Sequence, residues 1–463
     1  MKPEAKIFKA YDIRGIWNKE WDVESAYLIG KAIAKLKNPR TVAIGKDMRN
    51  SGEDIFEQLK KAFLEEGINV KDLGLCATEL TYYATSFREE IDLAIMITAS
   101  HNPAEYNGMK ITDEKGHCIG LEDGLNQIKD LILSANGEMS RVNGRISRGE
   151  FSKLDLWSEY QKHIFKLAKV EAQEIKQLKI VIDPANGMGG YTFDRIFHNL
   201  NLEVVRIFWD LDGTFPNHPA DPFRESNIEI LKRKVVEEKA DLGIAFDGDA
   251  DRVFFVDKLG RNFHGYYFAA FLTEYFLKNV VENSKAEAIA YDPRYYWALR
   301  KVADQHGTNH LISKAGHTLL KKSLREVQGP IAIETTGHVI FRDFNFNDTT
   351  MLTILFVLKM ISNGTNLTEA LDYYLKNYPI SGEYNYKVNN VTEILEKLEQ
   401  KYSTGEIIKI DGLGIDFSDW RFNVRTSNTQ PLMRLNIEAK SKELVAEKLA
   451  EIQEIIGVEA VDE

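Results

Sequence analysis

Cysteine is scarce in this chain, whose 463 residues include only Cys76 and Cys118. Two cysteines cannot build a disulfide framework or a cysteine-based zinc site. A single bridge between them stays open as an alternative. Reduced thiols are the interpretation that we prefer, and they are typical of a cytoplasmic protein.

Long apolar runs and excess positive charge are missing as well. Residues 1–6 lack the apolar segment of a signal peptide, and no stretch approaches the roughly eighteen apolar residues of a membrane-spanning helix. Lysine and arginine number 59 against 70 acidic residues, so the net charge is −11. No basic field is then available for nucleic acid or an anionic membrane. We expect a soluble cytoplasmic protein without either partner, in which local Arg and Lys side chains would catch an anionic ligand.

What the chain does have is a recurring order of strands and helices. Its length suits about three or four domains, and 44% hydrophobic with 28% charged residues is ordinary for a globular protein. Short β-branched runs end in Gly or Asp at 42–45, 180–183 and 289–292. Each is followed by a second run that leads into a polar loop, at 94–97, 243–246 and 331–333. This alternation predicts α/β units with buried, largely parallel strands.

The last part of the chain has a different pattern. Apolar and polar residues alternate over 433–439, and apolar residues then recur at near-helical spacing over 444–456. A half-buried strand followed by an amphipathic helix fits this pattern. We therefore predict an α/β fold of three similar mixed α/β domains, residues 1–150, 151–258 and 259–375, and a smaller C-terminal α+β domain, residues 376–463.

The acidic run at 247–252 places Asp247, Asp249 and Asp251 at alternate positions, between strand-like runs at 242–246 and 253–256. Crowded oxygen ligands suit a hard divalent cation such as Mg²⁺, and without one the carboxylates would raise one another's pKa values. An EF-hand loop needs Gly and Glu where this run has Arg252 and Lys258, so that alternative fails. A charged surface turn remains the other alternative, although a strand end is where sites in α/β sheets gather.

Residues 98–103 crowd hydroxyl, imidazole and amide groups around Ser100 after a predicted strand. A hydrolase would need a Gly-x-Ser-x-Gly elbow, which is missing here, and an adjacent His rarely faces its Ser on extended backbone. Considered alone, this loop is a structural turn, and His101 is an orienting or packing residue.

Further loops offer donors for an anion. Arg14 stands at a glycine turn, and the segment 425–431 combines Arg425 with hydroxyl and amide groups suited to a phosphate dianion. A solvated loop is the alternative for that segment, and Arg421 and Arg434 are interpreted as surface or supporting charges. The segment 334–338 pairs a carboxylate with an imidazole, which could also serve only to stabilise the loop. The glycines at 187–190 do not complete a dinucleotide-binding pattern, and no phosphate-binding P-loop occurs.

Taken together, the five segments 11–15, 98–103, 247–252, 334–338 and 425–431 occur in an order that resembles the α-D-phosphohexomutase superfamily. The resemblance spans nearly the whole chain and is closest to bacterial phosphomannomutases and phosphomannomutase/phosphoglucomutases. It implies four domains around a central cleft. It also implies a Mg²⁺-dependent enzyme, a monomer or homodimer, that interconverts hexose 1-phosphates and 6-phosphates, foremost mannose phosphates. A hexose 1,6-bisphosphate would be both intermediate and activator.

The resemblance also implies a role for each matching residue. Ser100 would carry a phosphoryl group and, with Asp247, Asp249 and Asp251, hold Mg²⁺. The candidates for acid–base and charge-stabilising roles are Arg14, Lys110 and His338. The expected substrate-binding residues are Arg252, Arg294, His317, Glu334, Thr336, Arg425, Ser427, Asn428 and Thr429.

Four positions depart from the family pattern, one of them Gln430, which stands where Glu is frequent. Ile333 and Thr336 replace the usual Gly and Ser of the sugar-contact loop, which leaves the preferred sugar open. Ala250 replaces a frequent Gly, a mild change unless this residue needs a positive φ. Phosphoglucomutase and phosphoglucosamine mutase are the rival activities, and a hydrolase or a non-catalytic sugar-phosphate binder are the alternatives from other classes.

Overall fold

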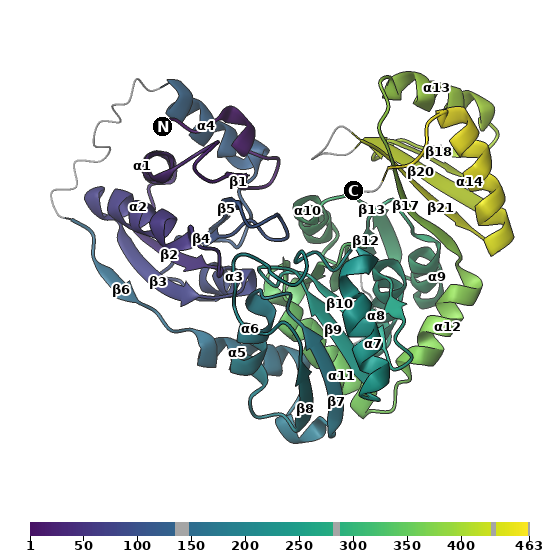
Figure 1. The fold of residues 1–463 in the computed structure, drawn as a ribbon, viewed down its shortest axis with the longest axis horizontal. Coiled ribbons are helices and arrows are strands. Elements are labelled where there is room, and N and C mark those ends of the chain that lie inside the picture. The colour runs from purple at the N-terminus through teal and green to yellow at the C-terminus, as the bar shows by residue number, and fades with distance from the viewer. Residues whose placement is uncertain (135–147, 281–287, 427–431, 462–463) are drawn as a thin grey trace. The chain divides into compact units, whose positions relative to one another are not determined.

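The computed structural model describes residues 1–134, 148–280, 288–426 and 432–461. The chain divides into two compact units (Figure 1). The first unit consists of Met1–Asn262 with Asp343–Thr365, and the second of Phe263–Arg342 with Asn366–Glu463. Within the described residues, no helix has the length and apolar character needed to cross a membrane.

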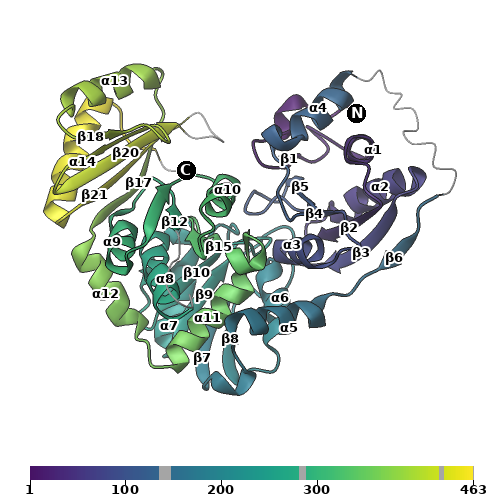
Figure 2. The same cartoon turned by 180° about the vertical axis from the view of Figure 1, so that it is seen from behind.

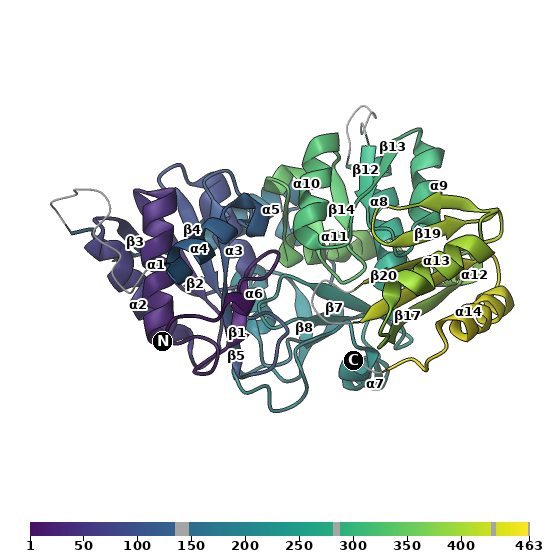
Figure 3. The same ribbon diagram turned by 90° about the horizontal axis from the view of Figure 1, so that it is seen from above.

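The first sheet of the first unit has the strand order β1-β5-β4-β2-β3-β6. Figure 3 shows helices α1 and α2 beside the strands β2 and β3 of this sheet. The strands are β1 Ile13–Ile16, β2 Thr41–Lys46, β3 Asn69–Leu75, β4 Leu93–Ile97, β5 Tyr106–Asp113 and β6 Phe151–Lys153. The helices are α1 Val23–Lys37, α2 Gly52–Glu65, α3 Thr78–Phe87 and α4 Leu125–Ser134.

The second sheet of this unit has the order β11-β10-β9-β7-β8. Helix α11, from the segment that joins the unit later in the chain, packs against α5 and α6 (Figure 2). The strands are β7 Leu178–Asp183, β8 Leu202–Arg206, β9 Leu242–Phe246, β10 Val253–Asp257 and β11 Asn262–Phe263. The helices are α5 Trp157–Ala168, α6 Met188–Phe197, α7 Glu229–Glu237 and α11 Thr350–Ser362, and the segment of α11 begins with strand β16 Asn347–Asp348.

The second unit contains the neighbouring strands β13-β12-β14-β15 and a C-terminal sheet of order β17-β21-β20-β19-β18. The first group comprises β12 Ala288–Tyr291, β13 Asn309–Ile312, β14 Ile331–Ile333 and β15 Val339–Phe341, with α8 Gly265–Asn279, α9 Trp297–His306, α10 His317–Val327 and α12 Leu367–Asn377. The second comprises β17 Ile380–Tyr386, β18 Glu406–Ile408, β19 Leu413–Asp416, β20 Trp420–Thr426 and β21 Met433–Ala439, with α13 Val391–Lys401 and α14 Lys442–Ile456.

One plan of strands is repeated three times. In each copy a central strand (β2, β7 or β12) lies parallel to its two neighbours, and one of these neighbours (β4, β9 or β14) pairs with the next strand in antiparallel fashion. The strands β4, β9 and β14 are buried along their whole length, as expected for strands covered on both faces. The loops that follow them are 98–105, 247–252 and 334–338. The three loops of chemical interest therefore occupy one equivalent position in the repeated unit.

The predicted strands and the different C-terminal pattern are confirmed. The predicted runs coincide with β2, β7, β12, β4, β9 and β14, except that the run 289–292 extends one residue past β12. The alternating segment is β21, and the following helix α14 begins at an N-cap in which the Ser441 side chain accepts from the Leu444 N–H. The apolar side of the C-terminal sheet packs with α13 and α14 in one hydrophobic cluster. The α/β fold of three similar domains and a smaller fourth is thus correct.

Candidate active site

Ser100 lies in a tight turn directly after β4. Its φ is 50°, a left-handed conformation that is uncommon for serine, and its N–H donates to Thr98 Oγ1 at 2.8 Å. This turn brings Ser100 Oγ to 3.2 Å from His101 Nδ1. The prediction that the adjacent His would not face the Ser is therefore wrong, because it assumed extended backbone. Burial is the main cause that lowers the pKa of His101 well below its ordinary value, and the positive charges of Arg252 and Arg14 add to it.

The acidic run is a buried cluster and not a surface turn. Asp247, Asp249 and Asp251 are each 0% exposed, and one carboxylate oxygen of each lies within 4.8 Å of the others. Ser100 Oγ donates to Asp247 Oδ2 at 2.8 Å, so the serine belongs to the cluster. Burial raises the pKa of Asp247 well above its ordinary value, and Asp251 and Asp249 raise it further.

These residues fit a hard divalent cation. The donor set consists of carboxylate oxygens with a serine oxygen beside them, which Mg²⁺ prefers to nitrogen or sulfur ligands. Asp249 Oδ1 is buried and has no hydrogen-bond partner in the part of the chain that the structure describes. A cation here would satisfy this oxygen and neutralise carboxylates that burial otherwise penalises.

Lys110, on β5, supplies positive charge to the same cluster. Its Nζ donates to Asp249 Oδ2 at 2.6 Å and to Asp251 Oδ2 at 2.5 Å. Burial acts to lower the pKa of Lys110, but the neighbouring aspartates outweigh burial and raise it above its ordinary value. Thr78, at the start of α3, donates its hydroxyl to Asp249 at 2.5 Å. Sequence reasoning missed Thr78.

Two predicted arginines also lie beside the serine turn. Arg14, on β1, donates to Asn102 Oδ1 at 2.7 Å and is paired with Asp12 at 2.5 Å. The Arg252 N–H donates to Asp247 Oδ1 at 3.1 Å, and its Nε lies 3.8 Å from Asp247 Oδ2. The first unit therefore brings together every site residue that the sequence predicted for it: Ser100, Arg14, Lys110, Asp247, Asp249, Asp251 and Arg252.

Sequence reasoning overlooked Arg49, in the turn after β2. This side chain is buried, and its guanidinium donates to backbone carbonyls of the serine loop. It also lies 3.3 Å from Asp47, whose carboxylate accepts from the Arg49 N–H at 2.9 Å. The sequence held a partial signal: Asp-x-Arg occurs at 47–49 and 292–294, directly after the central strand of a repeat, although the same pattern also occurs at 12–14 and 419–421.

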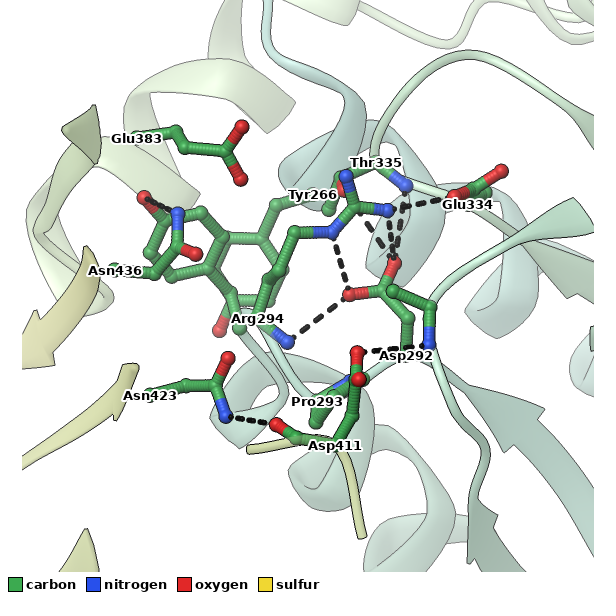
Figure 4. Close-up of polar contacts among 12 residues, drawn as sticks. Tyr266, Asp292, Pro293, Arg294, Glu334, Thr335, Glu383, Asp411, Asn423 and Asn436 are labelled. Carbon is green, nitrogen blue, oxygen red and sulfur yellow. Dashed lines mark hydrogen bonds and ion pairs between the residues drawn. The ribbon is translucent and has the colours of Figure 1, made fainter. Parts of the chain in front are cut away.

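In the second unit, Arg294 holds Glu334 (Figure 4). Its guanidinium makes two parallel bonds to Asp292, at 2.9 and 3.0 Å, and a third to Glu334 Oε1 at 2.9 Å. Arg294 is only 2% exposed, and Asp292 also accepts from the N–H and hydroxyl of Thr335, at 3.3 Å each. Burial acts to lower the pKa of Arg294, but Asp292 and Glu334 outweigh it and raise the pKa. Arg294 thus fixes the carboxylate of Glu334 by a bond to one of its two oxygens.

The other predicted residues of this loop lie close by. The rings of His317 and His338 are stacked, with centroids 4.6 Å apart and an interplanar angle of 20°. The Glu334 N–H donates to the His338 carbonyl at 3.0 Å, which closes the loop. Thr336 is partly exposed, whereas the neighbouring Thr335 is buried against Asp292. Thr336 is therefore the hydroxyl of this loop that a ligand could reach.

Arg425, at the end of β20, is 4% exposed and donates to Glu383 at 3.1 Å. Arg434 on β21 lies 3.3 Å from the other Glu383 oxygen. Burial lowers the pKa of Arg425, and Arg294 lowers it further. Glu383, on β17, thus orients two arginines beside the predicted phosphate-binding segment, and sequence reasoning missed it. The predicted residues Ser427, Asn428 and Thr429 lie outside the described residues.

Of the two interpretations of Arg421, a surface charge or a supporting charge, the first is wrong and the second agrees with its contacts. Arg421 is 0% exposed, and its guanidinium donates to the carbonyls of Pro293 and Arg294, at 3.0 and 2.9 Å, and to Asp416 at 2.9 Å. It also lies over the Tyr296 ring, 3.9 Å from the centroid. Arg421 therefore connects β20 of the C-terminal sheet to the turn that carries Arg294.

Comparisons with known proteins show the family of the chain. Domains I, II and III of the "Phosphoglucomutase/phosphomannomutase, alpha/beta/alpha" family models match residues 5–137, 158–260 and 264–378, and the C-terminal domain model matches 383–455. A phosphomannomutase of Vibrio cholerae is 35% identical over 98% of each chain, and that of Escherichia coli K12 is 34% identical over 94% of each. A solved phosphoglucomutase/phosphomannomutase family protein from Burkholderia thailandensis has 29% identity, a TM-score of 0.86 and 99% coverage of both chains. The chain belongs to the phosphoglucomutase/phosphomannomutase family and is a phosphohexomutase.

Proposed function

We propose that this enzyme interconverts hexose 1-phosphates and hexose 6-phosphates through a phosphoserine at Ser100, depends on Mg²⁺, and prefers mannose phosphates. One observation carries the proposal: the buried Ser100 hydroxyl donates to Asp247 within the three-carboxylate cluster, at 2.8 Å. A serine used only in a turn would have no reason to lie against a group that suits a cation. The preference for mannose is supported by relatives that are named phosphomannomutases.

In the proposed reaction, phosphoserine 100 gives its phosphoryl group to a sugar hydroxyl. The bond from phosphorus to Ser100 Oγ breaks as the bond from phosphorus to the sugar oxygen forms. The sugar hydroxyl proton leaves to a nearby base, and the departing Ser100 oxygen takes up a proton. The product is a hexose 1,6-bisphosphate. Its other phosphoryl group then returns to Ser100, which regenerates the enzyme and releases the isomeric monophosphate.

Asp247, Asp249 and Asp251, with an oxygen of the phosphoserine, would hold the Mg²⁺. Bound there, the cation would offset charge on the transferring phosphoryl group. Lys110 supplies a further positive charge at the same carboxylates, and Arg14 supplies one beside the serine turn through Asn102. Phosphoryl transfer requires positioning and charge neutralisation above all, and these side chains provide both.

For the second unit we propose substrate recognition. Glu334, fixed by Arg294, and the accessible hydroxyl of Thr336 would bind sugar hydroxyls. Arg425, oriented by Glu383, would bind the phosphate that is not reacting, together with Ser427, Asn428 and Thr429. We also propose that His317 and His338 of this unit, and Arg252 of the first unit, contact the sugar, and that His338 or Lys110 carries the proton. A hexose 1,6-bisphosphate would activate any unphosphorylated enzyme.

The direct test is intact-mass measurement before and after incubation with glucose 1,6-bisphosphate and Mg²⁺. We expect one phosphoryl adduct that peptide mapping assigns to Ser100, and none in Ser100→Ala. The same variant should lose nearly all mutase activity yet still bind hexose phosphate. An unmodified wild-type protein, or a Ser100→Ala enzyme with full turnover, would refute the phosphoserine route.

The sugar preference is tested separately by initial rates. Mannose 1-phosphate should be converted faster than glucose 1-phosphate or glucosamine 1-phosphate at equal concentration. If glucose 1-phosphate were converted more than about tenfold faster than mannose 1-phosphate, the enzyme would be a phosphoglucomutase. A tenfold difference in rate corresponds to about 1.4 kcal/mol in the activation barrier. Release of inorganic phosphate at the turnover rate would identify a hydrolase instead.

A further inference from the structure

The Arg49 guanidinium donates four hydrogen bonds to backbone carbonyls between Ser100 and Tyr106. Its Nη2 donates to the carbonyls of Ser100 and Asn102, at 2.8 and 2.6 Å. Its Nη1 donates to those of Pro103 and Tyr106, at 2.7 and 2.9 Å. Three of these acceptors belong to the loop between β4 and β5, Tyr106 is the first residue of β5, and one of the loop acceptors is the carbonyl of Ser100 itself.

This loop needs to be held because its backbone is strained. Ser100 has a φ of 50°, and a left-handed conformation costs a residue with a side chain roughly 1–2 kcal/mol. Ser100 is also 1% exposed, so its own carbonyl is shielded from water and depends on a donor from the protein. A planar guanidinium with a fixed set of N–H donors can satisfy several carbonyls at once and fix their mutual angles.

Arg49 is itself held on its other sides. Asp47 lies 3.3 Å from its Nε, and the Phe215 ring centroid lies 5.0 Å from its guanidinium carbon. The backbone of Gly213 packs so closely that an added Cβ would lie 2.8 Å from Arg49 Cα. The loop that contains Gly213 and Phe215 follows β8, a strand of the second sheet. A loop of the second sheet therefore covers Arg49, which follows β2 of the first sheet.

The repeat supplies an independent argument. Asp47, Asp183 and Asp292 each accept from the N–H two residues later, at 2.9, 2.9 and 3.0 Å, so the three turns are equivalent. In the turn of β12 the residue two positions after the aspartate is Arg294, which holds the loop that follows β14. An arginine at this position thus twice holds the loop of its own sheet.

We propose that Arg49 is a positioning residue for phosphoryl transfer, which sets the Ser100 hydroxyl against Asp247 by fixing the carbonyls of the serine loop. This inference rests on the proposed phosphoserine function. Arg49 acts through the backbone of the loop. Its loss should therefore slow the transfer step and leave substrate affinity nearly unchanged, because misplacing reacting groups by about 1 Å can cost about 100-fold in rate.

The experiment compares Arg49→Lys, Arg49→Met and a control, Lys31→Met. Lys31 is also a buried cation of the first sheet's domain and is paired with a buried carboxylate, Glu66. The measured quantities are the rate of phosphoryl transfer from glucose 1,6-bisphosphate to Ser100, by quenched-flow intact mass, and the Kd of mannose 1-phosphate, by calorimetry. Urea unfolding corrects both for the folded fraction.

We expect both Arg49 variants to slow the transfer about 100-fold with Kd changed by less than about threefold. Lysine retains the charge opposite Asp47 but cannot reproduce the guanidinium geometry. Arg49→Lys should therefore not restore the rate of phosphoryl transfer. Lys31→Met should lower stability because it removes the cation paired with the buried Glu66 carboxylate, and its transfer rate per folded molecule should stay within about twofold of wild type.

Several outcomes would overturn the proposal. A folded Arg49→Lys enzyme with wild-type transfer would remove the positioning role. A parallel loss of rate, affinity and folded fraction would reduce Arg49 to a structural residue. If neither Arg49 variant folded, Phe215→Leu, which loosens the cover over Arg49, should still slow transfer about fivefold with Kd retained, and wild-type transfer in it would refute the proposal. Failure of wild-type Ser100 to accept any phosphoryl group would instead disprove the proposed function.

Discussion

Arg49 in the first unit and Arg294 in the second occupy the same place in the repeated fold, yet they hold their loops in different ways. Arg49 donates mainly to neutral backbone carbonyls of the serine loop. Arg294 donates to two carboxylates, those of Asp292 and Glu334. The first contact fixes the path of the backbone, whereas the second orients a side chain and neutralises its charge.

The difference teaches what each loop requires. A nucleophile must be placed within a fraction of an ångström, and backbone contacts achieve this. A buried carboxylate that is to bind a ligand must instead be kept ionised at an acceptable cost, which a cation achieves. In the second sheet the equivalent residue is Ala185, and the loop after β9 carries the acidic cluster instead. The repeat has kept the aspartate turn and changed the residue that follows it.

The largest effect on stability is expected at Arg294. Arg294→Met would leave Asp292 and Glu334 buried without their cation, which should cost about 3–5 kcal/mol. Arg294→Lys keeps the charge and should recover most of this loss, in contrast to Arg49→Lys, whose transfer rate should not recover. Urea unfolding followed by circular dichroism measures the change, with the exposed Arg300→Met on α9 as the control, expected within about 0.5 kcal/mol of wild type. Equal losses for the Met and Lys variants at 294 would show that charge is not what Arg294 contributes.

The contrast between the loops held by Arg49 and by Arg294 could be predicted from the sequence only in part. The strands, the equivalent loops and the residues of the acidic run follow from periodicity and motif order, because each is local in the chain. The bonds of Arg49 to residues 100–106 are not local: they depend on the register of β2 against β4. The sequence left Arg421 open as a surface or a supporting charge, and the contacts with the turn at 293–294 that decide between them are not local in the chain. The predicted domain boundaries remain predictions.

A second prediction concerns how the free energy of unfolding depends on pH. It involves one buried glutamate in each unit, Glu79 in the first and Glu438 in the second. Glu79 accepts from the N–H groups of Thr350 and Met351 at the start of α11, and Glu438 from those of Tyr296 and Trp297 at the start of α9. Burial raises the pKa of each to about 7 from 4.5. The groups facing Glu79 are Tyr160, Thr349 and Thr350; those facing Glu438 are Tyr266 and Arg421, with the hydroxyls of Tyr267, Tyr295 and Tyr378 further off.

The sign of the pH dependence follows from the proton count. Between pH 4.5 and 7 the folded protein binds more protons at these groups than the unfolded chain does, so stability falls as pH rises through this range. Glutamine imitates the neutral acid, so Glu438→Gln and Glu79→Gln should each remove on the order of 2 kcal/mol of that fall. Urea midpoints at pH 4.5 and 7.5 provide the measurement. A variant that keeps the wild-type slope would show that its glutamate is ionised at both pH values.

A third effect, of about 1.4 kcal/mol in kcat/KM, is expected at Arg421. From β20, the Arg421 guanidinium donates hydrogen bonds to the carbonyls of Pro293 and Arg294. Arg421→Met should therefore loosen the turn at 293–294 and raise KM for hexose phosphate about tenfold. The matched control is Lys448→Met, which removes a cation that lies over Trp420 of the same strand. Because Arg421 acts through Arg294, its effect should shrink to about twofold in an Arg294→Lys background. Full additivity of the two changes would contradict this connection.

The smallest expected effect tests how the equivalent loops tolerate left-handed backbone. The loop after β9 contains Ala250, with a φ of 56°, and the loop after β14 contains Gly337, with a φ of 97°. The sequence question about Ala250 is thus answered: this residue does adopt a positive φ. Ala250→Gly would relieve roughly 1–2 kcal/mol of strain, but it would lose a buried methyl group worth about 0.8 kcal/mol and add about 0.5–1 kcal/mol of backbone entropy to the unfolded chain. These changes nearly cancel, so the unfolding free energy should shift by less than about 1 kcal/mol, whereas Gly337→Ala should cost at least that much. A loss above about 2 kcal/mol for Ala250→Gly, measured by urea unfolding, would mean that packing of the methyl group outweighs backbone strain in this loop.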